Sequence, residues 1–250
     1  MCACFGFDPL FFDRMWGYED NMSSHPATSL SHSDISGSLP DMLWVRAICA
    51  LGFGLSFLAH LCLTVPPSLK CPAATKILGR YTYLTVQSNV LCFCYHALRL
   101  VAPQSFVAVH GYPLAFALGF TLTVLYYGLN YFMAARVADD KLWKSKGYEW
   151  LPLACHLEHG MALPLALLDA LYGGHAGTTT SADVVVWISA YVAAYLSFTW
   201  INKRVGGVWV YPIFDAFEAK LGGSMGFWML GGPVALAYVG VGFLGQHLSG

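Results

Sequence analysis

The sequence predicts an all-α fold, namely a polytopic membrane helical bundle with six transmembrane spans. Of the 250 residues, 57% are hydrophobic and only 11% are charged, whereas soluble domains carry about a quarter charged residues. The mean hydropathy is +0.55. A helix needs about 20 apolar residues to cross a hydrocarbon core, and stretches of this kind recur six times along the chain.

The six expected spans cover roughly residues 42–65, 82–101, 112–135, 151–172, 184–202 and 226–247. The sixth is rich in glycine, and small residues allow helices to approach closely in lipid. Before the first span, a stretch rich in Ser, His, Asp and Pro is typical of a disordered or loosely ordered segment. We therefore expect an N-terminal tail over 1–41 and a six-span transmembrane domain over 42–250.

Positive charge alternates between the loops. Lys and Arg gather in 66–81, 136–150 and 203–225, while the other two inter-span loops and the C-terminus contain none. Cytoplasmic loops carry the excess of Lys and Arg, so these three loops are predicted to face the cytoplasm, in an endomembrane or the plasma membrane. The net charge of −1 indicates no basic surface for nucleic acid, and the expected partners are membrane lipids.

Polar residues form a stripe on the second span. Thr85, Ser88, Asn89, Cys92 and His96 are spaced so that they share one helical face. Polar groups in hydrocarbon are costly and usually face the interior of a bundle. The stripe is therefore predicted to face other helices, either as plain interhelical hydrogen bonding or as the wall of a polar pocket.

The fourth span carries a second polar cluster. His156 and His159 are three residues apart and share a face. Pro164 cannot donate to the carbonyl of Gly160, so a kink is expected one turn after His159. Because this span and the second enter from the same side of the membrane, Thr85 and His159 are expected at compatible depths, about 6 Å and about 12 Å.

Four motifs carry a family resemblance. They are "YLT" at 83–85, H-x-x-H-x-x-x-L-P at 156–164, an acid at Asp169, and G-x-W-V-Y-P at 207–212. In this order and spacing they resemble the androgen-induced-gene and androgen-dependent-TFPI-regulating-protein family, also called FAR-17a-like, over about residues 42–247. Animal members are integral membrane hydrolases of fatty acid esters of hydroxy fatty acids. They use a threonine nucleophile and a histidine.

The resemblance implies roles for particular residues. Thr85 matches the nucleophile and His159 the histidine that serves as its base, while His156 matches the first histidine of the motif. Trp209 and Tyr211 match a structural or pocket-forming motif. The family often has a carboxylate or an amide three residues after the threonine, where this chain has Ser88, followed by Asn89.

The implied reaction is hydrolysis of a lipid ester. A threonine hydroxyl needs a base to take its proton, and a neutral imidazole is suited to that task. No cofactor and no metal are expected for this reaction. The residue that orients His159 is open among Glu158, Asp169 and His156. The donors that stabilise the oxyanion are open among Asn89, Tyr211 and Ser88.

Two other classes of function remain open. Histidines in spans one, two and four could bind haem or a metal, through His60, His96, His156 and His159. The first two lie nearer the opposite membrane face from the last two, which weakens a single four-ligand site. A transporter or non-catalytic scaffold is the third class, although no span carries a clear pair of acids for an ion pathway.

Overall fold

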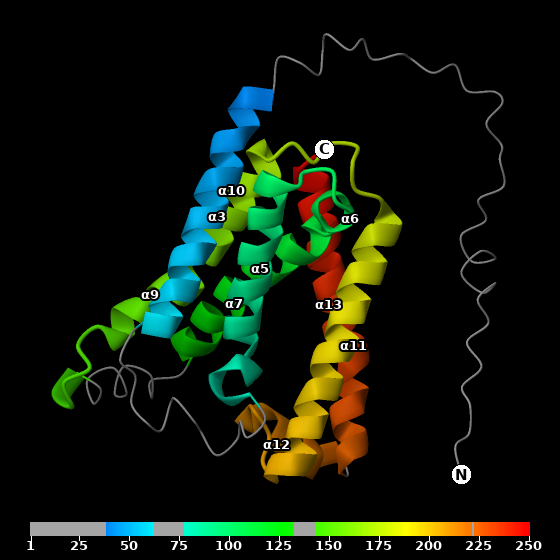
Figure 1. Ribbon diagram of the computed structural model, residues 1–250. Coiled ribbons are helices and arrows are strands. Elements are labelled where there is room, and N and C mark those ends of the chain that lie inside the picture. The colour runs from blue at the N-terminus through cyan, green and yellow to red at the C-terminus, as the bar shows by residue number, and fades with distance from the viewer. Residues whose placement is uncertain (1–38, 63–77, 133–143, 222) are drawn as a thin grey trace, which may run out of the picture. The chain divides into compact units, whose positions relative to one another are not determined.

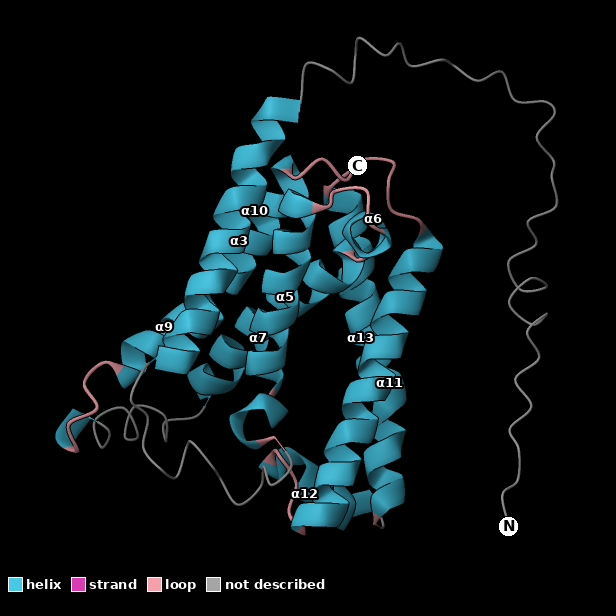
Figure 2. Cartoon of the chain, in the orientation of Figure 1, coloured by secondary structure: helices cyan, strands magenta, loops and turns pink. Residues whose placement is uncertain are grey.

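The computed structural model describes residues 39–62, 78–132, 144–221 and 223–250. Every regular element in this part of the chain is a helix, which confirms the all-α prediction (Figure 1; Figure 2). In chain order the elements are α3 (Leu39–Cys62), η1 (Gly79–Thr82), α5 (Leu84–Val101), α6 (Phe106–His110), α7 (Tyr112–Phe132), α9 (Leu151–Gly160), α10 (Ala162–Tyr172), α11 (Ser181–Gly206), α12 (Pro212–Leu221) and α13 (Ser224–Leu248).

Four helical segments among the described residues are long and apolar enough to cross a membrane. They are Met42–Ala59, Leu151–Tyr172, Ser181–Gly206 and Met225–Leu248. Helix α7 is apolar over a shorter stretch, Tyr112–Gly128. Helix α5 does not qualify, because the amide, imidazole and guanidinium side chains of its polar stripe lower its hydropathy. The structure thus supports four of the six expected spans by length and composition.

Helix α5 nevertheless packs inside the bundle, against α3 and α7. Its polar stripe faces inward: Ser88, Asn89, Cys92 and His96 are all buried. Leu91, on another face of the same helix, is 39% exposed. The expectation that the stripe faces other helices is therefore confirmed, and the low hydropathy of α5 reflects polar groups that face protein rather than lipid.

The predicted kink in the fourth span is confirmed as a break between α9 and α10. Helix α9 ends at Gly160 and α10 begins at Ala162. Thr123 of α7 lies at the break, where its hydroxyl donates to the carbonyl of His159 and accepts from the amide of Leu163. A side chain from a neighbouring helix thereby bonds backbone groups at the break, as irregular backbone inside a membrane protein requires.

Helix α11 is longer than the expected span 184–202 because both of its ends are capped. At its start, Thr180 and Asp183 form a reciprocal capping box. At its end, Gly207 adopts the left-handed conformation, with φ of 79°, which favours glycine. The helix therefore extends to Lys203 and Arg204, whose charges lie in its last turn.

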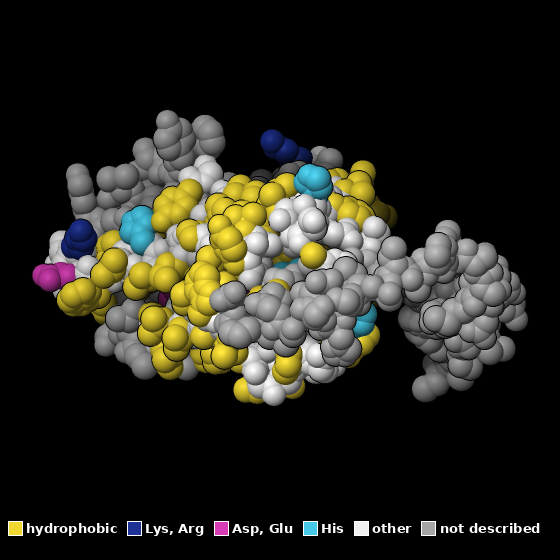
Figure 3. All heavy atoms as spheres, turned by 90° about the horizontal axis from the view of Figure 1, so that it is seen from above, with side chains coloured by type: hydrophobic (Ala, Val, Ile, Leu, Met, Phe, Trp, Pro, Cys, Tyr) yellow, Lys and Arg dark blue, Asp and Glu magenta, His cyan; other side chains and the backbone are white. Residues whose placement is uncertain are grey.

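The outer surface of the bundle is strongly apolar, as a lipid-facing surface must be. Figure 3 looks onto the end of the bundle that carries α6, where hydrophobic side chains are abundant and few charged groups appear. The exposed large side chains include Leu51, Leu55 and Leu58 on α3 and Met225, Met229 and Leu236 on α13. These residues lie on the long apolar helices that qualify as membrane spans.

The two ends of the bundle separate the two kinds of loop. Helix α12, η1 and α9 lie toward one end, and α6 and the C-terminus toward the other (Figure 1). The described parts of the basic loops thus lie at one end, and their cytoplasmic orientation stays a prediction. Of the expected tail 1–41, only the last three residues are described, and they begin α3. Most of the loop 66–81 and residues 136–143 also lie outside the described residues.

Candidate active site

Thr85 and His159 lie within hydrogen-bonding distance. The hydroxyl oxygen of Thr85 is 3.0 Å from Nε2 of His159. Thr85 lies in the first turn of α5, and His159 lies in the last turn of α9. Both side chains are partly buried. Two residues that are 74 positions apart in the chain therefore form a hydroxyl–imidazole pair near one end of the bundle.

The backbone of α9 determines which nitrogen of His159 faces Thr85. Nδ1 of His159 lies 2.7 Å from the carbonyl oxygen of Cys155. A carbonyl only accepts hydrogen bonds, so Nδ1 carries the hydrogen and Nε2 presents its lone pair to the Thr85 hydroxyl. This is the tautomer that a general base requires.

An aromatic ring fixes the plane of the imidazole. The rings of Tyr126 and His159 stack with their centroids 3.8 Å apart and their planes 18° apart. Tyr126 belongs to α7, so three helices contribute to this arrangement. Neither Tyr126 nor the Cys155 carbonyl is among the site residues predicted from the sequence. The i, i−4 relation between Cys155 and His159 could have suggested the carbonyl, whereas nothing in the sequence links Tyr126 to His159.

Asn89 joins the two helices that carry the pair. Its Nδ2 donates to the carbonyl oxygens of Thr85, at 3.1 Å, and of Glu158, at 3.0 Å. An amide nitrogen has two hydrogens, so both are used by these bonds. Asn89 therefore connects α5 to α9, and its amide donors are not available to an oxyanion.

Tyr211 contacts the first turn of α5 rather than the imidazole. Its hydroxyl accepts from the backbone amide of Leu84 at 3.0 Å. Its ring lies 5.9 Å from that of Tyr83. The start of α5 has no side-chain cap of its own, so Tyr211 satisfies one of the amide groups that every helix start leaves without an intrahelical partner.

Trp209 belongs to a separate cluster with α12 and α13. Its indole nitrogen donates to Glu218 at 2.7 Å, and its ring stacks on Phe227 at 4.3 Å. Lys203 pairs with Glu218 at 3.3 Å and lies over the Trp209 ring. The hydrogen bond from Trp209 is the largest cause that lowers the pKa of Glu218. Trp209 thus packs with α12 and α13, and the structural or pocket-forming role that the motif implied stays a prediction.

The other site residues predicted from the sequence have partners of their own outside the Thr85–His159 pair or lie elsewhere in the bundle. His156 lies on α9 with His159, but its Nδ1 faces the hydroxyl of Tyr127 at 2.9 Å. Ser88 is buried one turn after Thr85. Glu158 is buried and lies 3.9 Å from Arg80 of η1. Asp169 is buried on α10, where its Oδ2 lies 2.9 Å from Nε2 of His175.

Of the four histidines considered for haem or metal, the three whose side chains are described do not form one site. His159 bonds Thr85 and Cys155, and His156 faces Tyr127. The side chain of His60 lies outside the described residues. Over the described ranges, the grouping with metal-ligand geometry contains His96 but neither His156 nor His159.

Comparison with known proteins gives one family match. A family model described as "FAR-17a/AIG1-like protein" matches residues 53–245, which include both Thr85 and His159. No curated protein and no solved structure matches the chain.

Proposed function

Because the chain belongs to the FAR-17a/AIG1-like family and has several helices suited to a membrane, we propose that it is an integral membrane hydrolase of lipid esters. Thr85 is the nucleophile and His159 is its general base. The observation that supports this proposal is the 3.0 Å approach of the Thr85 hydroxyl to Nε2 of His159, with Nδ1 engaged by the Cys155 carbonyl. Fatty acid esters of hydroxy fatty acids are the substrate class of the resembled family.

In the first step, Nε2 of His159 takes the hydroxyl proton while the Thr85 oxygen attacks the ester carbonyl carbon. The tetrahedral intermediate collapses when the imidazolium returns the proton to the leaving alcohol. This leaves an acyl ester on Thr85. Water, deprotonated by the same imidazole, then attacks the acyl carbon. The bond from that carbon to the Thr85 oxygen breaks, the imidazolium returns its proton to the Thr85 oxygen, and the fatty acid leaves.

The start of α5 supplies donors for the oxyanion. The amide of Gln87 bonds the carbonyl of Tyr83, which closes the first turn, and Tyr211 takes the amide of Leu84. The amides of Thr85 and Val86 have no acceptor within the helix, because they lie in its first turn. The positive end of the helix dipole also lies there. We assign the oxyanion to these two amides, since the donors of Asn89 are committed to backbone carbonyls.

The location of the pair suits an ester at the membrane boundary. Thr85 lies in the first turn of α5 rather than at its middle. The acyl chains of a lipid would lie in the hydrocarbon layer while the ester group, which is polar, reaches the end of the bundle. Lipids are then both the surroundings and the substrate of the protein.

Fluorophosphonate labelling of the detergent-solubilised protein tests this proposal. The matched variants are Thr85→Ala with the control Thr199→Ala, and His159→Ala with the control His247→Ala. Thr199 is a buried threonine whose hydroxyl bonds carbonyls of its own helix. We expect labelling of the wild type and both controls, and loss of labelling in Thr85→Ala and His159→Ala.

Two results would contradict the proposal. Absence of labelling in the wild type favours the non-catalytic scaffold or transporter. Equal labelling of all variants, with size-exclusion profiles like that of the wild type, shows that the probe reacts elsewhere. If Thr85 is labelled, release of fatty acid from a panel of lipid esters then identifies the substrate.

A further inference from the structure

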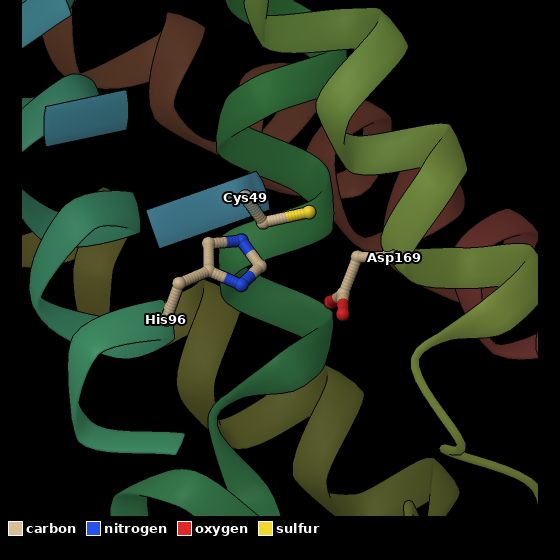
Figure 4. A group of neighbouring side chains, drawn as sticks. All are labelled: Cys49, His96 and Asp169. Atoms are coloured by element: carbon tan, nitrogen blue, oxygen red, sulfur yellow. The ribbon is translucent and has the colours of Figure 1, made fainter. Parts of the chain in front are cut away.

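Three side chains of metal-ligand type converge in the core, away from the Thr85–His159 pair. They are Cys49 of α3, His96 of α5 and Asp169 of α10, and Figure 4 shows them pointing toward one another. One ligand atom of each lies within 4.8 Å of the others. His96 follows Thr85 by 11 residues on α5, a rise of about 16 Å at 1.5 Å per residue. The cluster is therefore separate from the candidate active site.

Two atoms of this cluster are buried without a hydrogen-bond partner. Within the described part of the chain, Nδ1 of His96 and Oδ1 of Asp169 both have none, although each residue is only 2% exposed. Buried polar atoms are nearly always bonded, and burial without a partner costs free energy. Cys49, which is fully buried, makes one long contact from its sulfur to the carbonyl of Leu165 at 3.5 Å. The imidazole and the carboxylate that approach the Cys49 thiol thus each have one buried polar atom available for a ligand.

Neighbouring groups hold the imidazole and the carboxylate in place. The ring of His96 stacks on Phe53, with centroids 5.3 Å apart and planes 9° apart. The second oxygen of Asp169 lies 2.9 Å from His175, whose ring stacks on Tyr112 at 3.7 Å. A carboxylate that offers one oxygen to a cluster and binds a histidine with the other has the arrangement of a supported metal ligand.

We propose that Cys49, His96 and Asp169 bind one divalent cation of the zinc type. Thiolate and imidazole ligands favour Zn²⁺ over Mg²⁺ and Ca²⁺, which prefer oxygen. Zn–S bonds of about 2.3 Å and Zn–N bonds of about 2.0 Å at tetrahedral angles separate the ligand atoms by about 3.5 Å. The present separations need only side-chain adjustment to reach that value. A water molecule takes the fourth position.

Zinc binding releases one proton, that of the Cys49 thiol, for each cation bound. The Cys49 thiol loses its proton to solvent, the sulfur forms a bond to the cation, and the contact to the Leu165 carbonyl breaks. No group is oxidised or reduced. The thiolate and the Asp169 carboxylate together neutralise the two charges of Zn²⁺.

Nearby arginines make both anionic ligands necessary. Arg99 donates to Nδ1 of His175 at 2.8 Å and to the Gly173 carbonyl at 3.0 Å, and Arg46 interacts electrostatically with Asp169. These two cations oppose the binding of a third positive ion. The loss of either the thiolate or the carboxylate is therefore expected to abolish zinc binding. Without the two nearby arginines, the loss of one ligand would only weaken zinc binding.

The test uses the full chain, expressed with added zinc and purified in detergent without chelator. The variants are Cys49→Ser and Asp169→Asn, with Cys92→Ser as the matched control, because Cys92 is also a fully buried cysteine and bonds the Ala115 carbonyl. Elemental analysis is expected to give one zinc per chain in the wild type and in Cys92→Ser. The zinc is expected to be lost in Cys49→Ser and in Asp169→Asn.

Cobalt substitution supplies a second measurement, and its wild-type result does not depend on the folding of any variant. In the wild type, Co²⁺ exchanged into the site should give a thiolate-to-metal charge-transfer band and the visible bands of a tetrahedral ion. Cys92→Ser should keep them and Cys49→Ser should lose the charge-transfer band. A wild type that retains no zinc and shows no charge-transfer band overturns the proposal, as does an unchanged spectrum in Cys49→Ser.

Discussion

Asn89 and Glu158 are joined across two helices by a side-chain-to-backbone bond of 3.0 Å. The same amide of Asn89 also holds the carbonyl of Thr85. Asn89 thus links the backbone of Thr85 on α5 to Glu158, the residue of α9 that precedes His159. The separation of Thr85 from His159 depends on this bond as well as on the packing of the helices.

Replacing Asn89 with Ala is therefore expected to slow fluorophosphonate labelling of Thr85 by about 10- to 100-fold, because a displacement of about 1 Å between nucleophile and base has effects of this size. Labelling rates of purified protein measure the effect. The control is Gln87→Ala, which removes an exposed amide of the same helix that bonds only the Tyr81 carbonyl. A rate for Asn89→Ala equal to that of the control would show that packing alone sets the geometry.

Because Tyr126 stacks on His159, we expect the labelling rate of Thr85 to depend on the aromatic ring of Tyr126 and not on its hydroxyl. Tyr126→Phe keeps the ring and is expected to label at nearly the wild-type rate. Tyr126→Leu loses the stacked partner, so the imidazole gains rotational freedom and labelling slows by about tenfold. If Tyr126→Phe slows labelling as much as Tyr126→Leu does, the hydroxyl rather than the ring is the important feature of Tyr126.

Glu218 makes the bond to Trp209 sensitive to pH. Its pKa is lowered below the ordinary value of 4.5, first by the hydrogen bond from Trp209 and then by Lys203. A carboxyl whose pKa is lowered by folding stabilises the folded state above its unfolded pKa, and this contribution is lost as the pH falls through the folded pKa. The indole N–H resonance of Trp209 in ¹⁵N-tryptophan-labelled protein is expected to shift below pH 4.5.

Glu218→Gln is the control for that titration. The amide keeps an oxygen acceptor for the Trp209 indole but has no charge to lose. The resonance of Trp209 should then stay constant across the same pH range. A shift of equal size in Glu218→Gln would assign the titration to another group.

Two glycines of α13 differ in what a side chain would meet. A Cβ at Gly245 would lie 2.4 Å from the ring of Phe116, which is only 1% exposed, whereas a Cβ at Gly240 meets nothing within 4 Å. Gly245→Ala is expected to destabilise the protein by about 1–3 kcal/mol, the usual cost of overpacking. Gly240→Ala should leave stability unchanged or slightly higher, since alanine favours helices. Thermal unfolding of the two variants in the same detergent measures the difference. Equal unfolding midpoints would contradict the close packing of Gly245 against Phe116.

The sequence by itself determined the all-helical class, the inward polar stripe of α5 and the break after His159. These follow from composition, from a period of 3.6 residues and from one proline, all of which act locally on the chain. The resemblance also pointed to Thr85 and His159. Of the six expected spans, α5 falls short by composition, because the polar groups that it buries against protein lower its hydropathy. Helix α7 falls short by the length of its apolar stretch, Tyr112–Gly128.

Only the tertiary structure decided how the candidate site is held together. The Cys155 carbonyl sets the tautomer of His159, and the stacked ring of Tyr126 fixes the plane of the imidazole. The amide hydrogens of Asn89 bond backbone carbonyls and are therefore not available to an oxyanion. Asp169, grouped with the active-site motifs by its spacing in the sequence, lies instead with Cys49 and His96. Spacing along one helix fixes which residues share a face, but the partner that each face meets depends on how separate helices pack, and no local pattern encodes that.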